Sequence, residues 1–505
     1  MQPTAPLTLR PASLDDAQLL LDWANDPAVR AASFDSAPIP FDTHVRWLAG
    51  KLAGGETAFF ICEDRTRPVG YARVERRDAR TGELAVSVDE SCRGRGYGRT
   101  LIALAAAAGS SELGVDRVTA RVKRANVSSL RAFRAAGFAE ASETGSDPVV
   151  LTWTPPDVPH SRPWLGEAEA EAAAAVVRSG RLALGARGAE LERRWCELTG
   201  TAAAACVGSG LAGLRLGLLA LGVGPGDEVV VPAYSCVALL NAALALGAEP
   251  VLADVLRDDW TLDPASVSER LSSRTRAIVA VNLFGAPARI AELATLGVPV
   301  LEDCAHGIGG RTDAGRFGGG GAVSIGSFYP TKLVAGGEGG IVAAHDPDLL
   351  DRVRSARDYG DRLPSGLHLN DKMTDVEAAI VLCQLDRLDE IVARRAARAS
   401  TYDAALASLE QRGIVVLPRR HPDRLWYRYA VRLTSDSAER VCRALADRGV
   451  RAEQPVWDLR AAAQWRDDLA TTAEAFDAVV SLPIYPDLTP DEQDRVCSAF
   501  EAVVA

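Results

Sequence analysis

Lys332 is one of only four lysines in the chain and lies in a stretch rich in glycine. The chain has 505 residues and 56 Lys plus Arg, so arginine supplies almost all of its cationic surface. A lysine can lose its proton and form an imine with an aldehyde, whereas a guanidinium stays protonated. Burial within the loop 326–340 would favour the neutral amine further. We therefore predict carbonyl chemistry at Lys332, with a solvated loop lysine as the alternative.

An acidic segment follows a strand-like run shortly before this loop. Residues 298–301 are apolar, and the sequence Glu-Asp-Cys-Ala-His at 302–306 comes directly after them. This pattern is typical of a buried parallel strand that carries an acid to its carboxyl end, where open α/β sheets bind ligands. Pyridoxal phosphate (PLP) needs such an acid, because a carboxylate against its pyridinium nitrogen keeps the ring an electron sink. The alternative for Asp303 is a helix cap.

Small residues at two places could hold the phosphate of such a cofactor. Ser327 lies five residues before Lys332, and Ser209, Gly210 and Leu211 begin an apolar helical segment. The first N–H groups of a helix bind anions well. The alternative for the Ser-Gly pair is an ordinary turn.

Four stretches occur in the order expected for one family. They are 221–232, 302–306, Lys332 together with 336–340, and 481–486. From about residue 162 to the C-terminus, the chain therefore resembles the DegT/DnrJ/EryC1/StrS family of PLP-dependent sugar aminotransferases. This resemblance implies the aspartate-aminotransferase fold.

The resemblance also implies roles for the catalytic candidates. Lys332 would bind the cofactor aldehyde and move the proton during amine transfer, Asp303 would contact the pyridinium nitrogen, and His306 would lie near the phenolic oxygen. Some relatives carry His in place of the lysine and dehydrate the sugar, so Lys332 favours amine transfer. The alternative from a different class is a non-catalytic sensing or scaffolding module.

The cofactor contacts implied by the family include two departures and one contribution from a second subunit. Ser209, Gly210 and Ser327 would hold the cofactor phosphate. Cys236 stands where the family commonly stacks an aromatic residue on the pyridine ring, and Leu211 stands where Thr is usual. Asn370 belongs to a segment, 370–375, that resembles the one by which one subunit reaches into its neighbour's site. A homodimer is therefore implied.

A second glycine loop lies in the N-terminal part of the chain. Residues 83–90 alternate with period two, the sequence Arg-Gly-Arg-Gly-Tyr-Gly follows at 93–98, and 99–109 has the pattern of an alanine-rich helix. Such a loop directs several N–H groups and the positive end of a helix toward one point, which suits a pyrophosphate. A dinucleotide fold would also require an acid on a second strand, and none follows at the expected distance.

A strand and a helix farther along identify a different family. Residues 118–122 form a strand pattern, and 126–138 combine an Asn-x-x-Ser start with a closing Gly-Phe. With the Arg-x-x-Gly-x-Gly loop, they resemble the GNAT acetyltransferases. The segments 9–12, 22–30 and 44–47 are similar, more narrowly, to GNAT enzymes that acetylate amino groups of nucleotide-linked sugars. The resemblance implies acetyl-CoA contacts at Val86, Val88, Arg93, Gly94, Gly96, Tyr97, Gly98 and Asn126.

The proton-transfer groups of this N-terminal part are less clearly marked. Many GNAT enzymes carry a Tyr on the helix after the Asn, where it protonates the leaving thiolate, and the equivalent place here holds Phe133. Glu83 and His44 are the candidate bases for the attacking amine. Their alternatives are a solvated strand-edge carboxylate and a helix-surface imidazole. Polarisation of the thioester by N–H groups of the strand before the loop needs no side chain.

Bulk properties exclude several classes of partner. A net charge of −11 argues against nucleic acid and anionic membranes. The nine cysteines form no C-x-x-C pair, so we expect no metal site and no disulfide framework. No apolar run reaches the length of a membrane helix, and the first residues lack the pattern of a signal peptide. We expect a cytoplasmic protein.

The domain prediction follows from these segments. We expect an α/β chain with a GNAT domain at 1–155, a proline-rich linker at 156–163, a large PLP domain with a mostly parallel sheet at 164–393 and a small α+β domain at 394–505.

The predicted function combines both parts. The chain would transfer an amino group from glutamate or glutamine to a nucleotide-linked 3- or 4-keto-6-deoxyhexose, and would then acetylate the new amine with acetyl-CoA. Two alternatives stay open, namely amination of a keto-cyclitol, and an acetyltransferase with an unrelated acceptor or without activity.

Overall fold

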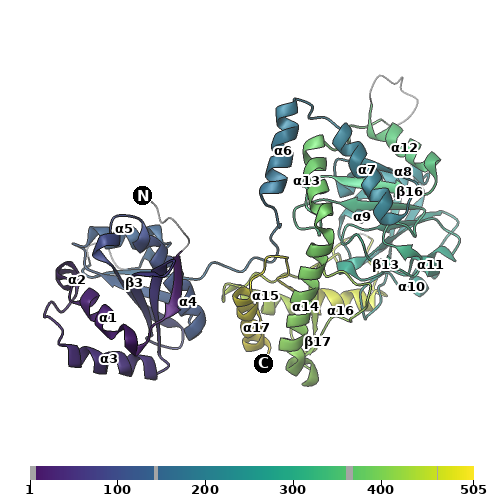
Figure 1. Cartoon of the computed structure of the whole chain (residues 1–505). Helices are drawn as coiled ribbons and strands as arrows, with labels where there is room; N and C mark the ends of the chain where they lie inside the picture. The colour runs from purple at the N-terminus through teal and green to yellow at the C-terminus, as the bar shows by residue number, and fades with distance from the viewer. Residues whose placement is uncertain (1–6, 142–145, 360–367, 463) are drawn as a thin grey trace. The chain divides into compact units, whose positions relative to one another are not determined.

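The computed structural model describes residues 7–141, 146–359, 368–462 and 464–505 (Figure 1). The chain divides into two compact units, Met1–Asp157 and Val158–Ala505. Val158 forms a parallel bridge with Val450, and His160 is buried in the second unit. The second unit therefore begins inside the segment 156–163, for which the sequence predicts a linker. Within the described ranges, no helix combines the length and the apolar character needed to cross a membrane.

Unit 1 is a seven-stranded sheet with helices on both faces. The strand order is β1-β2-β3-β4-β5-β7-β6, and only β4 and β5 run parallel. Alternate residues of β2 enter different cores, since Phe59 packs with α1 and α3 whereas Phe60 packs with α4 and α5. The elements are β1 (Leu7–Pro11), η1 (Leu14–Asp16), α1 (Ala17–Ala24), α2 (Pro27–Ala32), α3 (Phe41–Ala53), β2 (Thr57–Asp64), β3 (Arg67–Arg76), β4 (Thr81–Val88), η2 (Glu90–Cys92), α4 (Tyr97–Leu113), β5 (Arg117–Val122), α5 (Val127–Ala135), β6 (Ala139–Glu140) and β7 (Val149–Trp153).

The two parallel strands of unit 1 pair over only part of their length. The register joins Thr81 to Arg117 and ends with Glu83 opposite Thr119. The remaining residues of β4, up to Val88, pair with β3 but not with β5. Backbone N–H groups on the β5 side of β4 are thus left without a strand partner, as the predicted thioester site requires.

The large sheet of unit 2 has the order β10-β9-β11-β12-β15-β16-β8, parallel from β10 to β15. Its strands are nearly all apolar because helices cover both faces of the sheet. Helices α8, α9 and α12 pack on one face, and α7, α10, α11 and α13 pack on the other. The elements are α6 (Glu167–Ser179), α7 (Ala186–Thr199), β8 (Ala203–Val207), α8 (Gly210–Ala220), β9 (Glu228–Pro232), α9 (Ala238–Leu244), β10 (Glu249–Ala253), α10 (Pro264–Ser268), β11 (Thr275–Val281), η3 (Leu283–Gly285), α11 (Ile290–Ala294), β12 (Val300–Asp303), β13 (Arg311–Thr312), β14 (Gly315–Arg316), β15 (Val323–Ser327), β16 (Gly340–Ala344), α12 (Pro347–Arg357) and α13 (Asp375–Asp386).

A smaller antiparallel sheet, β17-β18-β19, completes unit 2. The helix α14 (Leu388–Gln411) passes without a break through residue 394, where the sequence predicts the start of the small domain, so this long helix belongs to both parts. The other elements are β17 (Val415–Val416), β18 (Tyr429–Leu433), α15 (Ala438–Ala446), α16 (Ala470–Ala478), β19 (Val479–Leu482) and α17 (Pro490–Val504).

Candidate active sites

Lys332 lies in the loop between β15 and β16, at the carboxyl edge of the large sheet. Backbone hydrogen bonds close this loop at its base, since the Phe328 N–H donates to Gly339 and the Gly336 N–H donates to Phe328. The lysine side chain is half-buried and lines a small cavity that Ala305 and Ser327 also line. No carboxylate among the described residues lies within ion-pair distance of its ammonium group. The amine is therefore free for other chemistry.

Asp303 is the acid that faces this side of the sheet. It ends β12, is 3% exposed and accepts a hydrogen bond of 2.7 Å from the Ala305 N–H. Burial raises the pKa of its carboxyl to about 6, although this hydrogen bond and the charge of Lys332 act in the opposite direction. Glu302, its neighbour, points the other way and accepts from Asn282 and from the Gly318 N–H. Alternation along the strand thus directs Glu302 to bonds within the protein and Asp303, the predicted cofactor contact, to the side of Lys332.

His306 is held as a neutral imidazole beside the lysine. Burial and the nearby cations Lys332 and Arg428 lower its pKa well below the usual value. The Phe284 N–H donates to His306 Nδ1 at 3.1 Å, so the ring proton resides on Nε2. The imidazole is therefore a hydrogen-bond donor through Nε2 at neutral pH.

Tyr427 is a site residue that sequence reasoning missed. Its ring stacks on His306 with centroids 4.3 Å apart, and the ammonium of Lys332 lies 5.1 Å from its centroid. Burial alone would raise the pKa of the phenol, but the charges of Lys332 and Arg428 lower it to about 8. The hydroxyl lies 3.3 Å from Thr331 Oγ1. The sequence does show an aromatic cluster at 426–429, but no motif or spacing near it indicates contact with Lys332.

Ser209, Gly210 and Ser327 come together at the start of α8. Ser209 caps the helix by accepting a hydrogen bond from the Ala212 N–H at 3.1 Å. A Cβ on Gly210 would lie 2.8 Å from Ser327 Cβ, so only glycine fits there. The N-terminus of α8 thus forms a cradle beside Ser327, and the positive end of a helix next to a serine suits a phosphate.

The other predicted cofactor contacts lie at more open positions. Leu211 is 44% exposed on the first turn of α8, and Cys236 is exposed after β9. Tyr234 does not replace the missing aromatic, because it is buried in the core against Trp260. Asn370 is exposed and follows residues outside the described range. Its contribution to a partner subunit stays a prediction.

The residues present fit PLP. Asp303 is a buried acid with one hydrogen bond, Lys332 is an unpaired amine, and the Gly210 cradle would be filled by a Cβ. Bound there, the cofactor would supply the electron sink for amine transfer. Asp303 would hold its ring nitrogen, and the cradle would hold its phosphate.

The glycine loop of unit 1 has the geometry that an anion site needs. Gly94 and Gly96 have φ of 72° and 86°, and α4 begins at Tyr97 directly after them. Arg93 donates to the Val88 carbonyl at 3.1 Å, which fixes the loop to the end of β4. The loop therefore presents N–H groups at the N-terminus of a long helix.

The side chains of this loop point to local partners. Arg93 is ion-paired with Asp26 at 3.1 Å, and the Tyr97 hydroxyl donates to Asp64 at 2.6 Å. A Cβ on Gly98 would meet only ordinary contacts. Asn126 caps α5 by accepting from the Ser129 N–H. Backbone groups, more than charged side chains, are thus available to a pyrophosphate.

The proton-transfer candidates of unit 1 differ in their surroundings. Glu83 is ion-paired with Arg77 at 2.8 Å. His44 is 3% exposed in the cluster of α1 and α3, so the helix-surface alternative is wrong. Burial lowers its pKa, and Nε2 has no hydrogen-bond partner among the described residues. Phe133 is a core residue packed edge-on against Phe138, so it offers no acid.

Comparison with known sequences agrees with both predicted families. Residues 163–501 match the DegT/DnrJ/EryC1/StrS aminotransferase family. The chain belongs to this family. Residues 6–139 match the acetyltransferase (GNAT) domain, so the chain carries a second enzyme domain at its N-terminus.

Solved structures similar to unit 2 are aminotransferases. TlmJ from Streptoalloteichus hindustanus is 31% identical over 68% of this chain and 98% of its own, with a TM-score of 0.65. DesV from S. venezuelae, solved with a ketimine intermediate, is 33% identical over 67% of this chain and 94% of its own, with a TM-score of 0.61. NtdA from Bacillus subtilis, solved with bound PMP, is 26% identical over 67% of this chain and 83% of its own, with a TM-score of 0.63.

These findings confirm the predicted families, the fold class and the presence of two transferase domains in one enzyme. The two families carry the expected cofactors with them, PLP for the aminotransferase and acetyl-CoA for the GNAT domain. An aminotransferase family also argues against the scaffolding alternative.

Proposed function

We propose that this enzyme transfers an amino group from glutamate or glutamine to a nucleotide-linked 3- or 4-keto-6-deoxyhexose and then acetylates the new amine. The observation that carries the proposal is the pairing of two sites in one chain. One site contains Lys332, Asp303 and the glycine cradle that would hold a phosphate, and the other is a GNAT domain in which two parallel strands pair over only part of their length. The first makes a primary amine, and the second consumes one.

In amine transfer, Lys332 would bind the cofactor aldehyde and carry the proton between donor and acceptor carbons. Its unpaired, half-buried ammonium group supports this role. Asp303 would keep the pyridine nitrogen protonated. His306 would donate from Nε2, since its Nδ1 is already an acceptor.

In acetylation, the N–H groups of Val86 and Val88 would polarise the thioester. The free β5 side of β4 supports this role. The loop 93–98 would bind the pyrophosphate. Glu83 and His44 stay the proposed bases, because only a neutral amine attacks acetyl-CoA.

The assembly and the cell compartment belong to the same proposal. We infer a homodimer in which Asn370 of one subunit contacts the cofactor of the other. The expected compartment is the cytoplasm. The domain limits 1–155, 164–393 and 394–505 remain proposals within this scheme.

The Lys332→Ala variant tests the amine transfer. We expect loss of the visible absorbance of the bound cofactor and loss of turnover. Lys332→Arg is the matched control, because arginine keeps the charge but forms no imine. Retention of absorbance or turnover by either variant would remove Lys332 from this role. A panel of keto nucleotide sugars and keto-inositols then identifies the substrate class.

A further inference from the structure

His160 is a buried histidine in the segment that connects the two units. Backbone hydrogen bonds fix this segment beside residues 449–451, since the Val158 N–H donates to Gly449 at 2.8 Å and the Arg451 N–H donates to Val158 at 3.0 Å. The side chain of His160 is 4% exposed. The residue precedes position 163, where the match to the aminotransferase family begins. Family membership therefore assigns no role to this histidine.

The imidazole of His160 contacts three polar side chains. Its Nδ1 lies 2.8 Å from Glu453 Oε2, and its Nε2 lies 2.8 Å from Ser481 Oγ. Nη1 of Arg428 lies 2.6 Å from Nδ1 and 3.2 Å from Nε2. Burial lowers the pKa of His160, so the ring is neutral at pH 7 and carries one proton. The carboxylate of Glu453 favours this proton on Nδ1, which leaves Nε2 as the acceptor for Arg428 and Ser481.

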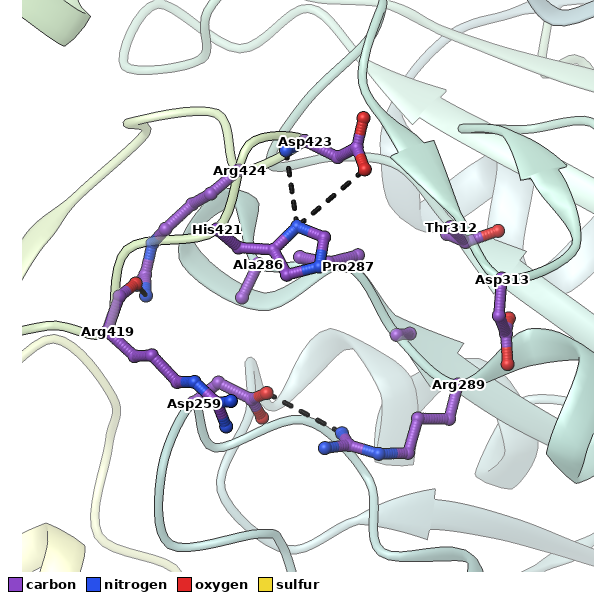
Figure 2. Close-up of a pocket in the computed structure, with 11 residues that line it drawn as sticks. Asp259, Ala286, Pro287, Arg289, Thr312, Asp313, Arg419, His421, Asp423 and Arg424 are labelled. Atoms are coloured by element: carbon purple, nitrogen blue, oxygen red, sulfur yellow. Dashed lines mark hydrogen bonds and ion pairs between the residues drawn. The ribbon is translucent and has the colours of Figure 1, made fainter.

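Arg428 is held by this ring and not by a carboxylate. Arg289, by contrast, faces an acid directly, because a carboxylate oxygen of Asp259 lies 3.5 Å from its guanidinium (Figure 2). Among the described residues, Arg428 forms no direct ion pair. The hydrogen bond with His160, and then the charges of His160 and Arg428, lower the pKa of Glu453. The guanidinium is thus fixed in position through the imidazole, while no acid of the described ranges contacts it.

The guanidinium of Arg428 lies against a residue of the amine-transfer site. Its Cζ is 4.8 Å from the centroid of the Tyr427 ring, which in turn stacks on His306. Burial raises the pKa of Tyr427, but the charges of Lys332 and Arg428 lower it to about 8. The same two charges add to the effect of burial in lowering the pKa of His306. The position of Arg428 therefore affects both aromatic groups beside Lys332.

A second arginine beside Tyr427 does not depend on His160. Arg395 is 3% exposed and donates to backbone carbonyls, that of Tyr427 among them, at 3.2 Å. Its charge also lowers the pKa of Tyr427, with a smaller effect than that of Arg428. Backbone groups hold Arg395, whereas Arg428 is only half-buried and can turn toward solvent. Loss of the imidazole would therefore move the charge of Arg428 and leave that of Arg395 in place.

We propose that His160 is a positioning residue for amine transfer, because it holds the guanidinium of Arg428 over the ring of Tyr427. The segment 158–160 then belongs to the amine-transfer machinery and is more than a connection between two domains. This inference rests on amine transfer by unit 2 but not on the proposed keto sugar.

The half-reaction of the full-length, PLP-loaded protein with glutamate tests the proposal, because it requires no keto sugar. Glutamine replaces glutamate if glutamate does not react. The absorbance of the bound cofactor gives the rate, which is measured as a function of pH. Wild type should show a break in the pH–rate profile near the phenol pKa of about 8 of Tyr427.

His160→Phe keeps a ring in place but removes both hydrogen-bonding nitrogens. It should move the break upward by about one pH unit, because a phenolate with a cation farther away is less stable. Arg428→Met should move the break in the same direction. The variant with both substitutions should show no further shift beyond Arg428→Met, since His160 acts through Arg428. His160→Gln keeps a donor and an acceptor and should move the break less than His160→Phe does.

His345→Phe is the matched control, because His345 is an exposed histidine of unit 2 that hydrogen-bonds the Gly319 carbonyl. It should leave the break unchanged, and thermal unfolding should show which variants are folded. If His160→Phe does not fold, His160→Gln in the wild-type and Arg428→Met backgrounds provides the same comparison. The proposal is wrong if wild type shows no break near pH 8, or if the His160 variants leave it in place. It is also wrong if the shifts of the His160 and Arg428 substitutions add in full, since a merely structural histidine would act independently of Arg428.

Discussion

Asp303→Asn should stabilise the cofactor-free protein above neutral pH. The folded state holds this carboxyl buried, with its pKa raised from 3.8 to about 6. An acid with a raised pKa favours folding fully while it is protonated, and that contribution is lost as the pH rises through about 6. The gap between 3.8 and about 6 corresponds to about 3 kcal/mol. The amide of asparagine avoids this loss and still accepts from the Ala305 N–H.

Urea denaturation of the cofactor-free protein at several pH values measures the effect. The difference in unfolding free energy between variant and wild type should be small near pH 4 and should approach about 3 kcal/mol near pH 8. Asp447→Asn, which changes an exposed acid, is the control and should show no such trend. With PLP bound, the variant should instead lose cofactor affinity. A difference that does not change with pH would refute the assignment of a buried Asp303 with a raised pKa.

Three further substitutions test other parts of the two sites. Gly210→Ala should weaken PLP binding at least tenfold, because its Cβ would lie 2.8 Å from Ser327 Cβ; an unchanged dissociation constant would place the phosphate elsewhere. Tyr427→Phe should slow amine transfer about tenfold and remove the break in its pH–rate profile near the phenol pKa of about 8, and an unaltered profile would exclude proton transfer by Tyr427. Gly98→Asp should raise the KM for acetyl-CoA about tenfold through repulsion of the pyrophosphate, while the isosteric Gly98→Asn should not; equal effects of the two would contradict a charge mechanism.

Local patterns were sufficient to predict the elements that carry the chemistry. Period-two alternation before the loop 93–98 predicts a strand at 83–90, and the structure has β4 at Thr81–Val88. The apolar run at 298–301 predicts a strand that ends in acids, and β12 is Val300–Asp303. The shift of its start places Pro299 outside the strand, which is consistent with the missing N–H of proline.

Sequence patterns could not predict features that depend on contacts between residues far apart in the chain. Tyr427 comes from the small domain, almost a hundred residues after Lys332, and only tertiary packing brings the two together. The burial of His160 also could not be predicted, since its hydrogen-bond partners Arg428 and Ser481 lie far along the chain. The burial of His44 depends on packing between α1 and α3. No periodicity or spacing in the sequence predicts these contacts of Tyr427, His160 and His44.

Product analysis of wild type and two variants tests the coupled reaction most directly. The purified protein receives acetyl-CoA, glutamate and a panel of keto nucleotide sugars, and products are followed by mass. Wild type should yield the N-acetylated amino sugar. Gly98→Asp should accumulate the free amino sugar when acetyl-CoA is held below the raised KM of the variant, and Lys332→Ala should yield neither product yet acetylate an amino sugar supplied to it. Accumulation of free amino sugar by wild type, without consumption of acetyl-CoA on any aminated substrate, would contradict the coupled reaction.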